Sequence, residues 1–289
     1  MIFNGSGVAL ITPFNEDKTI NYKKLEELIE FHITNFTDAI IICGTTGESS
    51  TLDINEKKEL IKFSVEKANG RIPIIAGTGS NNINIAIKLS KYAEYVGVDG
   101  LLIVTPYYNK CSQEGLYLSY KQIANNVTIP ILLYNVPSRT GVNIELDTVI
   151  KLSKISNIVG IKEASGNISQ IAKIISKVSP DFYVYSGNDD QVLPILSLGG
   201  KGVISVAANI IPFQIHTICD SFFKKDFYTS KDLFYKYLNL MNKLFIDINP
   251  IPIKEAMNIL DYNVGKFRLP LCSISSENYK ILKKSLDII

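Results

Sequence analysis

Lys162 lies within an apolar run, residues 158–165, whose composition is typical of a buried strand. Lysine is rarely buried without a partner, because removing water from an ammonium group is costly. Burial favours the neutral amine, and a neutral amine is a nucleophile toward ketones. A side chain that extends to solvent from the strand end, or that pairs with an acid, would explain the same residue. The strand taken alone leaves both interpretations open.

The histidine and cysteine content of the chain limits the kinds of catalytic site that it can form. The only histidines are His32 and His216, and both fall in helical patterns, which argues against a histidine-rich metal site and a Ser-His-Asp triad. If the chain is an enzyme, its catalytic groups must be lysine, tyrosine, threonine and arginine side chains. The cysteines form no C-x-x-C pair, which argues against a disulfide framework and a zinc site; they are Cys43, Cys111, Cys219 and Cys272.

The bulk properties indicate an ordered chain with a large core. Of its 289 residues, 46% are hydrophobic and 20% charged, with a net charge of +2. No basic block suggests a nucleic-acid partner, and no apolar run has the length of a bilayer span. The first residues show no signal-peptide pattern. We therefore expect a cytoplasmic protein with reduced cysteines, without a membrane or nucleic-acid partner.

Short apolar runs alternate with amphipathic segments along most of the chain. Eight such β-then-α units predict a (β/α)8 barrel, and the absence of a G-x-G-x-x-G motif argues against a dinucleotide-binding sheet. The expected strands are residues 8–14, 39–43, 72–77, 100–105, 130–135, 158–163, 182–186 and 202–207. Expected helices include residues 22–35, 55–69, 83–96 and 147–153.

The pattern after about residue 209 is purely helical, with a break at residues 248–252. We interpret residues 1–225 as the barrel and residues 226–289 as a C-terminal helical region packed on it.

Polar and reactive residues gather where the expected strands end. In a (β/α)8 barrel these ends share one face, which carries the active site. Each motif has a simpler explanation: a Gly-Thr-Thr-Gly turn can be only a loop, paired tyrosines can be packing, and Asp189 and Asp190 suit a cap of the next helix better than a metal. Their convergence on one face is the stronger evidence. The segments are residues 44–49, 105–109, 134–141, 162, 186–190 and 203–205.

The chemistry that fits these residues is formation of a Schiff base with a small 2-oxo acid. Lys162 would attack the ketone, and the turn at Thr45 and Thr46, with the helix N-terminus expected after it, would hold the carboxylate. Tyr134 would give and take protons, connected to solvent through Thr45 and Tyr108. The remaining group, Arg139, offers a planar fork for a second carboxylate, on an aldehyde partner.

These residues resemble the pyruvate-dependent Schiff-base aldolases typified by dihydrodipicolinate synthase and N-acetylneuraminate lyase. The similarity runs from Gly7 to about Lys266. Within the family the motifs look like those of the dihydrodipicolinate synthases, since the sialic acid lyases have Ser-Thr at 45–46 and generally lack an arginine at 139. The motifs are residues 12–14, 44–48, 134–137, 160–163 and 186–189, together with 138–141.

The resemblance implies condensation of pyruvate with L-aspartate 4-semialdehyde, without an organic cofactor or a catalytic metal. It implies that Lys162 forms the imine and Tyr134 transfers protons, and that Thr45 and Tyr108 complete the relay, Tyr108 coming from a dimer partner. Substrate contacts would come from Thr46, Arg139, Gly187 and the backbone at Ile204. Family members are usually homotetramers built as dimers of dimers.

One departure concerns feedback inhibition by lysine. The lysine site of inhibited members resembles Ser49, Ser50, Asn81 and Tyr107, but Ile85 stands where they place a glutamate. They often have histidines where this chain has Ile54 and Lys57. An ammonium ligand without that carboxylate loses its main attraction, so we expect weak or absent inhibition. A second departure, Cys111 in place of proline, should alter the stiffness of a loop rather than the chemistry.

Three other functions are compatible with parts of the pattern. The nearest is a lyase for sialic or sugar-derived 2-oxo acids on the same scaffold. A catalytically silent barrel that binds a 2-oxo acid is less consistent with the full set of reactive residues. A metal-dependent aldolase using Asp189 and Asp190 is weaker still.

Overall fold

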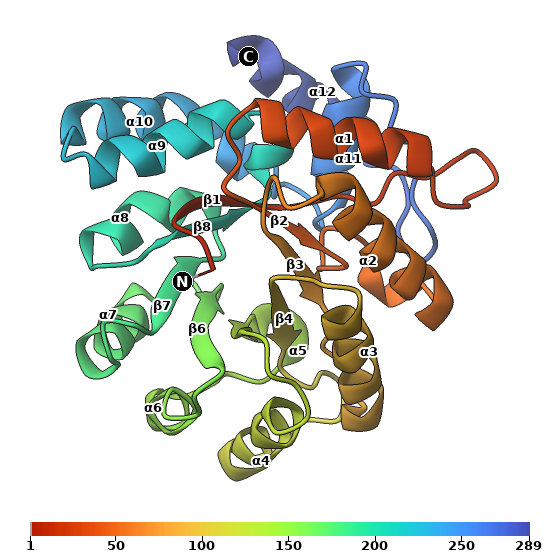
Figure 1. Ribbon diagram of the computed structural model, residues 1–289. Helices are drawn as coiled ribbons and strands as arrows, with labels where there is room; N and C mark the ends of the chain where they lie inside the picture. Colours follow the sequence, from red (N-terminus) through yellow and green to blue (C-terminus); the bar gives the residue numbers. More distant parts are fainter. Residues whose placement is uncertain (1) are drawn as a thin grey trace.

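The computed structural model describes residues 2–289, in which eight parallel strands close into a barrel in chain order (Figure 1). The last strand pairs with the first, so the barrel has no open edge. The predicted (β/α)8 barrel is confirmed. The strands are β1 Gly5–Ala9, β2 Ala39–Ile42, β3 Ile74–Gly77, β4 Gly100–Val104, β5 Ile131–Asn135, β6 Ile158–Glu163, β7 Tyr183–Ser186 and β8 Gly202–Ser205.

Apart from the short helix α5, which lies within the ring beside β4, the α-helices surround the strands (Figure 1). Those following the first seven strands are α1 Tyr22–Thr34, α2 Ile54–Ala68, α3 Ile83–Tyr95, α4 Gln113–Ala124, α5 Pro137–Thr140, α6 Leu146–Leu152, α7 Ile168–Lys177 and α8 Val192–Ser197. After β8 come α9 Pro212–Phe223, α10 Phe227–Lys243, α11 Ile251–Ile259 and α12 Ser276–Ser285. Single 3-10 turns are η1 Ser49–Thr51, η2 Asp189–Gln191, η3 Ala207–Asn209 and η4 Leu286–Ile288.

Several helices begin where the sequence offers a capping side chain. Asp53 accepts hydrogen bonds from the N–H groups of Asn55 and Glu56, while Glu56 reaches back to the N–H of Asp53, a complete capping box at the start of α2. Asn21 and Asn82 likewise cap α1 and α3. The predicted helices at 22–35, 55–69, 83–96 and 147–153 are confirmed to within one residue at each end.

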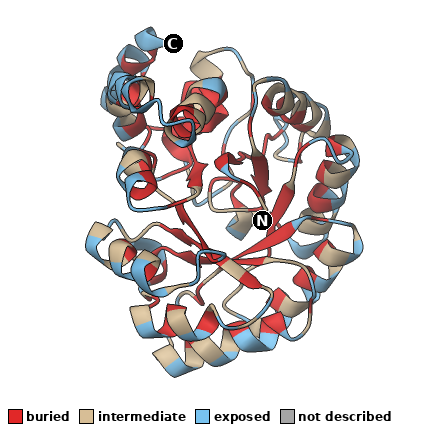
Figure 2. Ribbon diagram, turned by 60° about the vertical axis from the view of Figure 1, so that its left-hand side comes forward, coloured by how far each residue is buried: buried red, intermediate tan, exposed pale blue. Residues whose placement is uncertain are grey.

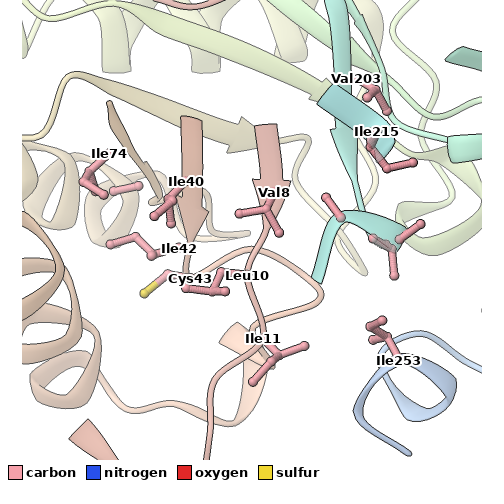
Figure 3. Packing of buried hydrophobic residues seen from close by; sticks show 14 of the residues in the cluster. Val8, Leu10, Ile11, Ile40, Ile42, Cys43, Ile74, Val203, Ile215 and Ile253 are labelled. Atoms are coloured by element: carbon pink, nitrogen blue, oxygen red, sulfur yellow. The ribbon is translucent and has the colours of Figure 1, made fainter. Parts of the chain in front are cut away.

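The position of the first strand was predicted wrongly. It spans Gly5–Ala9, whereas the sequence pattern placed it at residues 8–14. A Cβ atom at Gly7 would lie 2.7 Å from the end of the Ile41 side chain, and Gly5 has a φ of 105°, so both positions favour glycine within the strand. The apolar residues Leu10 and Ile11 are buried, but they belong to the loop that follows β1. Figure 3 shows this loop beyond the end of the strand, with Ile253 of α11 next to it.

Two apolar layers follow from the alternation of side chains along each strand. Val8, Ile40, Ile42 and Val203 belong to the layer between the strands and the helices, together with residues such as Ile215 of α9 (Figure 3). Figure 2 shows the same pattern, with buried residues on the strands and on one side of the helices. A second cluster fills the barrel interior; among its members are Ala9, Ile41, Ile75, Leu102, Leu132, Tyr134, Tyr185 and Ile204.

The segment after α9 continues the outer shell. Helix α10 packs on α9, and α12 packs on α10 and α11. Phe234 and Leu240 of α10 and Ile253 of α11 are buried in the same cluster as the outer faces of the strands. None of the helices within residues 2–289 is long and apolar enough to cross a membrane.

Candidate active site

Lys162 and Tyr134 are neighbours inside the barrel. They are register partners on β6 and β5, and register partners in parallel strands point to the same face. Both are buried, with 5% and 7% of their surfaces exposed. The Lys162 side-chain nitrogen lies 4.6 Å from the centre of the Tyr134 ring. Among the described residues no carboxylate forms an ion pair with Lys162, so the alternative of a paired lysine is not supported.

A cavity of about 270 Å³ opens at the carboxyl ends of β2 to β5. Tyr134 and Thr45 line it, as do Tyr107 and Arg139. The aromatic ring beside Lys162 thus also forms part of the cavity wall. The other lining residues are Cys43, Gly44, Ser49, Ser50, Lys57, Gly77, Gly79, Leu102, Val104, Val136 and Thr140.

The Thr45–Thr46 turn presents one threonine to the cavity and buries the other. The side chain of Thr46 accepts a hydrogen bond from Asn249 Nδ2 at 3.0 Å. The N–H of Glu48 donates to the Thr45 carbonyl at 3.1 Å, which closes the turn. The turn is followed by the single 3-10 turn Ser49–Thr51, and the expected helix α2 begins at Ile54, six residues after Glu48.

Arg139 lies at the mouth of the cavity, on the short helix α5. Its side chain is exposed, and Nη2 donates to the backbone carbonyl of Asn249 at 2.8 Å. One hydrogen bond leaves the rest of the guanidinium fork available to a carboxylate.

Tyr108 does not reach the cavity of its own chain. The residue is 92% exposed and has a φ of 71°, and its neighbour Tyr107 lines the cavity instead. Within one chain, therefore, the structure brings together Thr45 and Tyr134 but not the third member of the predicted relay.

Gly187 and Ile204 lie near Lys162 but outside the cavity lining. Gly187 donates its N–H to the Glu163 carbonyl at 2.7 Å, and a Cβ atom there would lie 2.5 Å from Ala164 Cβ. Ile204 is fully buried in the interior cluster that contains Tyr134. Both positions are close-packed, so each fixes the backbone at the ends of β6 to β8.

Asp189 performs a different role from the predicted cap of the next helix. Its Oδ2 accepts hydrogen bonds from the N–H groups of Val206 and Ala207, both at 3.0 Å, so it caps the segment after β8. Burial raises the pKa of Asp189, opposed by these hydrogen bonds. No group of three potential metal-ligating side chains occurs within residues 2–289. A metal site built on Asp189 and Asp190 is not supported.

Asn249 is a site residue that the sequence did not reveal. It donates to Thr46 through its side chain and accepts from Arg139 through its carbonyl, although it lies more than 100 residues away from both. The only signal was its position in the helix break at residues 248–252, which the sequence marks as a turn and not as a site.

A buried polar network supports β5 and β6 from the side opposite to Lys162 and Tyr134. Asn135 Nδ2 donates to Glu163, and Ser165 Oγ donates to the other carboxylate oxygen at 2.5 Å. Burial raises the pKa of Glu163. Because Asn135 and Glu163 follow Tyr134 and Lys162 in the two strands, this network fixes the relative position of the two interior side chains.

The fold and the site together define a class: (β/α)8 barrels with a buried lysine and a tyrosine at the carboxyl ends of adjacent strands, suited to imine formation. The chain matches the model of the dihydrodipicolinate synthetase family over residues 2–289, and it belongs to that family.

Curated relatives cover nearly the whole chain. The 4-hydroxy-tetrahydrodipicolinate synthase of Clostridium perfringens (strain SM101) is 56% identical over 285 residues, covering 99% of this chain and 98% of the relative. The 4-hydroxy-tetrahydrodipicolinate synthase 1 of Clostridium acetobutylicum is also 56% identical, with 99% and 97% covered.

Solved structures agree with the fold. Dihydrodipicolinate synthase from Aquifex aeolicus superimposes with a TM-score of 0.96 at 46% identity, covering 99% of this chain and 97% of that one. The enzyme from Cyanidioschyzon merolae with lysine bound gives a TM-score of 0.97 at 40% identity, covering 99% and 98%.

Proposed function

We propose that this protein condenses pyruvate with L-aspartate 4-semialdehyde and forms 4-hydroxy-tetrahydrodipicolinate, on the route to diaminopimelate and lysine. The observation that carries the proposal is the buried Lys162 beside Tyr134, which lines the cavity, in a chain 56% identical to 4-hydroxy-tetrahydrodipicolinate synthases over almost its full length.

The first half of the reaction builds a nucleophile from pyruvate. The amine of Lys162 adds to the ketone carbon, and loss of water from the carbinolamine gives an imine. Loss of a proton from the methyl carbon then gives an enamine. Tyr134 is the group that carries these protons, because a phenol can both donate and accept and its ring contacts the Lys162 side chain.

The second half joins the two substrates. The enamine carbon attacks the aldehyde of the semialdehyde, and the new alkoxide takes a proton. The semialdehyde's own amino group then adds to the imine carbon and displaces Lys162, which closes the ring and frees the enzyme. Overall one water is released, and no oxidant or reductant is consumed.

The remaining polar groups of the site bind the carboxylates of the two substrates. The 2-oxo acid carboxylate rests against Thr45 and Thr46, with the backbone at Ile204 and Gly187 completing its pocket. The exposed guanidinium of Arg139 takes the carboxylate of the semialdehyde. The support for these roles is that Thr45 and Arg139 both line the same cavity.

The proton relay requires a second copy of the chain. In this proposal Tyr108 enters the site of a dimer partner, and two such dimers form a homotetramer. The support is the 92% exposure of Tyr108 and its position outside the cavity of its own chain. A monomeric dihydrodipicolinate synthase variant with a TM-score of 0.97 is among the similar structures, so the assembly needs direct measurement.

Two further proposals concern organisation and location. The barrel comprises residues 1–225 and the C-terminal helical region residues 226–289; the support is that α10 to α12 follow the last barrel helix and pack on one another. The protein acts in the cytoplasm, which agrees with the free thiols of its four cysteines.

The decisive assay supplies pyruvate and L-aspartate 4-semialdehyde and follows the oxidation of a nicotinamide by the next reductase. We expect turnover by the wild type and a loss of at least about 1,000-fold in Lys162→Ala, because the nucleophile is absent. Circular dichroism checks the fold of the variant. Wild-type protein that is folded but inactive in this assay would refute the proposed substrates.

A further inference from the structure

Lys254 of α11 and Glu48 form an ion pair from which water is excluded. Their side chains are 0% exposed, and Lys254 Nζ lies 2.8 Å from Glu48 Oε1. The same nitrogen donates to the backbone carbonyls of Thr12 at 3.1 Å and Lys266 at 3.0 Å. An ammonium group has three donors, so every one of them is used. The ring of Phe14 lies against the same nitrogen, 4.4 Å from its centre.

The carboxylate of Glu48 is held equally well on its other side. Its Oε2 accepts a hydrogen bond from the backbone N–H of Arg268 at 3.1 Å. The Arg268 guanidinium in turn binds both carboxylate oxygens of Glu56, in the first turn of α2, at 2.5 and 2.7 Å. The C-terminal segment therefore fixes Glu48 through two independent groups.

The backbone of Glu48 gives a reason why the side chain matters. Its φ is 53°, in the left-handed region that disfavours residues other than glycine. A glycine would suit the backbone of this turn better than a glutamate. The position therefore holds a carboxylate at the expense of backbone strain, and that carboxylate is used in the contacts with Lys254 and Arg268.

The ion pair is attached to the back of the turn that forms the cavity wall. Gly44, Thr45 and Ser49 line the cavity, while Glu48 between them is buried and points away toward α11. Gly47 is fixed on the same side, because its carbonyl accepts from Thr12 Oγ1 at 2.7 Å. Movement of Glu48 would thus move Thr45, which faces the cavity, and the buried Thr46 beside it.

We propose that Lys254 is a positioning residue, which acts through Glu48 to hold the Thr45–Thr46 turn where it can bind the carboxylate of a 2-oxo acid. This inference rests on the proposed function. A buried ion pair is a poor device for stability, since apolar residues of similar shape often serve as well. It is directional, however, and a small misplacement of a substrate-binding group is sufficient to reduce the rate severely.

The first test compares Lys254→Met with the wild type in the coupled assay. We expect the KM for pyruvate to rise at least about tenfold, together with weaker trapping of the pyruvate imine by borohydride. The matched control is Ile174→Ala, which removes a fully buried side chain on α7, on a different helix from Lys254. The control should lower the melting temperature but keep the KM for pyruvate within about twofold of the wild type.

A second pair of variants keeps the inference testable if Lys254→Met does not fold. Glu48→Gly relieves the left-handed backbone but removes the carboxylate, and we expect at least about a tenfold loss in kcat/KM for pyruvate. Glu48→Gln retains the shape and an acceptor for Lys254, so its loss should be intermediate. A Glu48→Gly enzyme within about twofold of the wild type would overturn the inference, because the turn would then need only its backbone.

The outcomes separate this inference from the proposed function. Wild-type turnover with unchanged kinetics in both Lys254→Met and Glu48→Gly would refute the positioning role and leave the function intact. A wild type that forms the pyruvate imine but does not use the semialdehyde would refute the proposed function. Imine trapping in the variants would then still show whether Lys254 and Glu48 affect the binding of pyruvate at the Thr45–Thr46 turn. A wild type that forms no imine would refute both.

Discussion

The side-chain nitrogen of Lys162 lies 4.6 Å from the centre of the Tyr134 ring, and the two residues are register partners on adjacent strands. Their separation is therefore fixed by the hydrogen bonds between β5 and β6. The nucleophile and the proposed proton carrier need no loop movement to meet.

Replacing Tyr134 by phenylalanine should reduce kcat by about 100- to 10,000-fold, because the ring remains but the proton-transferring hydroxyl is lost. Packing in the barrel interior should be preserved, so the melting temperature should change little. Borohydride trapping should still detect slow imine formation with pyruvate. An enzyme with unchanged kcat would show that another group transfers the protons.

Replacing Arg139 by alanine should impair the use of L-aspartate 4-semialdehyde but not the binding of pyruvate. The side chain is exposed at the cavity mouth and donates its hydrogen bond to Asn249, not to Lys162 or Tyr134, so pyruvate imine formation should persist. The kcat/KM for L-aspartate 4-semialdehyde should fall by about 100-fold or more, since a charge-assisted hydrogen bond to its carboxylate is lost. Equal loss for both substrates would indicate a general structural role, and loss for neither would favour a different aldehyde partner.

Exchange of Tyr108 between subunits can be tested by mixing inactive variants. Tyr108→Phe and Lys162→Ala should each be weakly active, because each site lacks one group. In a hybrid dimer one site regains both residues, so random reassembly of equal amounts should restore about one quarter of wild-type activity. No recovery, with hybrids demonstrated by native mass spectrometry, would show that Tyr108 acts within its own chain or not at all.

Lysine at about 1 mM should not inhibit the enzyme measurably, because the expected site has no carboxylate for the ligand's ammonium. Ile85, where inhibited family members place a glutamate, is 45% exposed. Lys57 lines the cavity beside Ser49 and Ser50, which adds a like charge. Burial lowers the pKa of Lys57.

The matched variant for this prediction is Ile85→Glu combined with Lys57→His. It restores the acidic group, and steady-state inhibition by lysine should become stronger than in the wild type. Wild-type inhibition at sub-millimolar lysine would contradict the prediction.

Acid should destabilise the protein through His32. Burial lowers the pKa of His32 to about 3, so the folded state keeps it neutral while the unfolded chain binds a proton near pH 6.5. Its contribution to stability is therefore complete above about pH 6.5 and is lost as the pH falls, by about 2 kcal/mol at pH 5. The imidazole Nδ1 lies 2.9 Å from Thr37 Oγ1.

The contribution of His216 to stability has the opposite pH dependence. The hydrogen bond that His216 donates to the Asp38 carboxylate raises the pKa of His216, so its stabilisation is present below about pH 6.5 and is lost as the pH rises through the higher folded value. The pair is partly exposed, which limits its effect to less than about 1 kcal/mol.

Urea denaturation from pH 7.5 to 5 measures both effects. In His32→Gln the acid-induced fall in the free energy of unfolding should shrink by about 2 kcal/mol, whereas His216→Gln should steepen it slightly. Parallel curves for wild type and His32→Gln would contradict the assignment.

Local sequence patterns were sufficient to predict the barrel and much of the site. The strand Ile158–Glu163 and its lysine follow from an apolar run, and α2 follows from an amphipathic segment. The first strand was misplaced because Gly5 and Gly7 look like loop residues, whereas Leu10 and Ile11 look like strand. Only the neighbours across the closed barrel show why glycine is needed within the strand.

The sequence by itself determined the βα order, the placement of Lys162, Tyr134, Thr45 and Arg139 at strand ends, and the membership of a family, because these depend on periodicity and short motifs. The tertiary structure alone decided that Asn249 contacts Thr46 and that Lys254 pairs with Glu48. These partners lie 203 and 206 residues apart, and no local pattern encodes which distant residues meet. Closure of the barrel and docking of α11 bring them together, and exclusion of water then makes their hydrogen bonds specific.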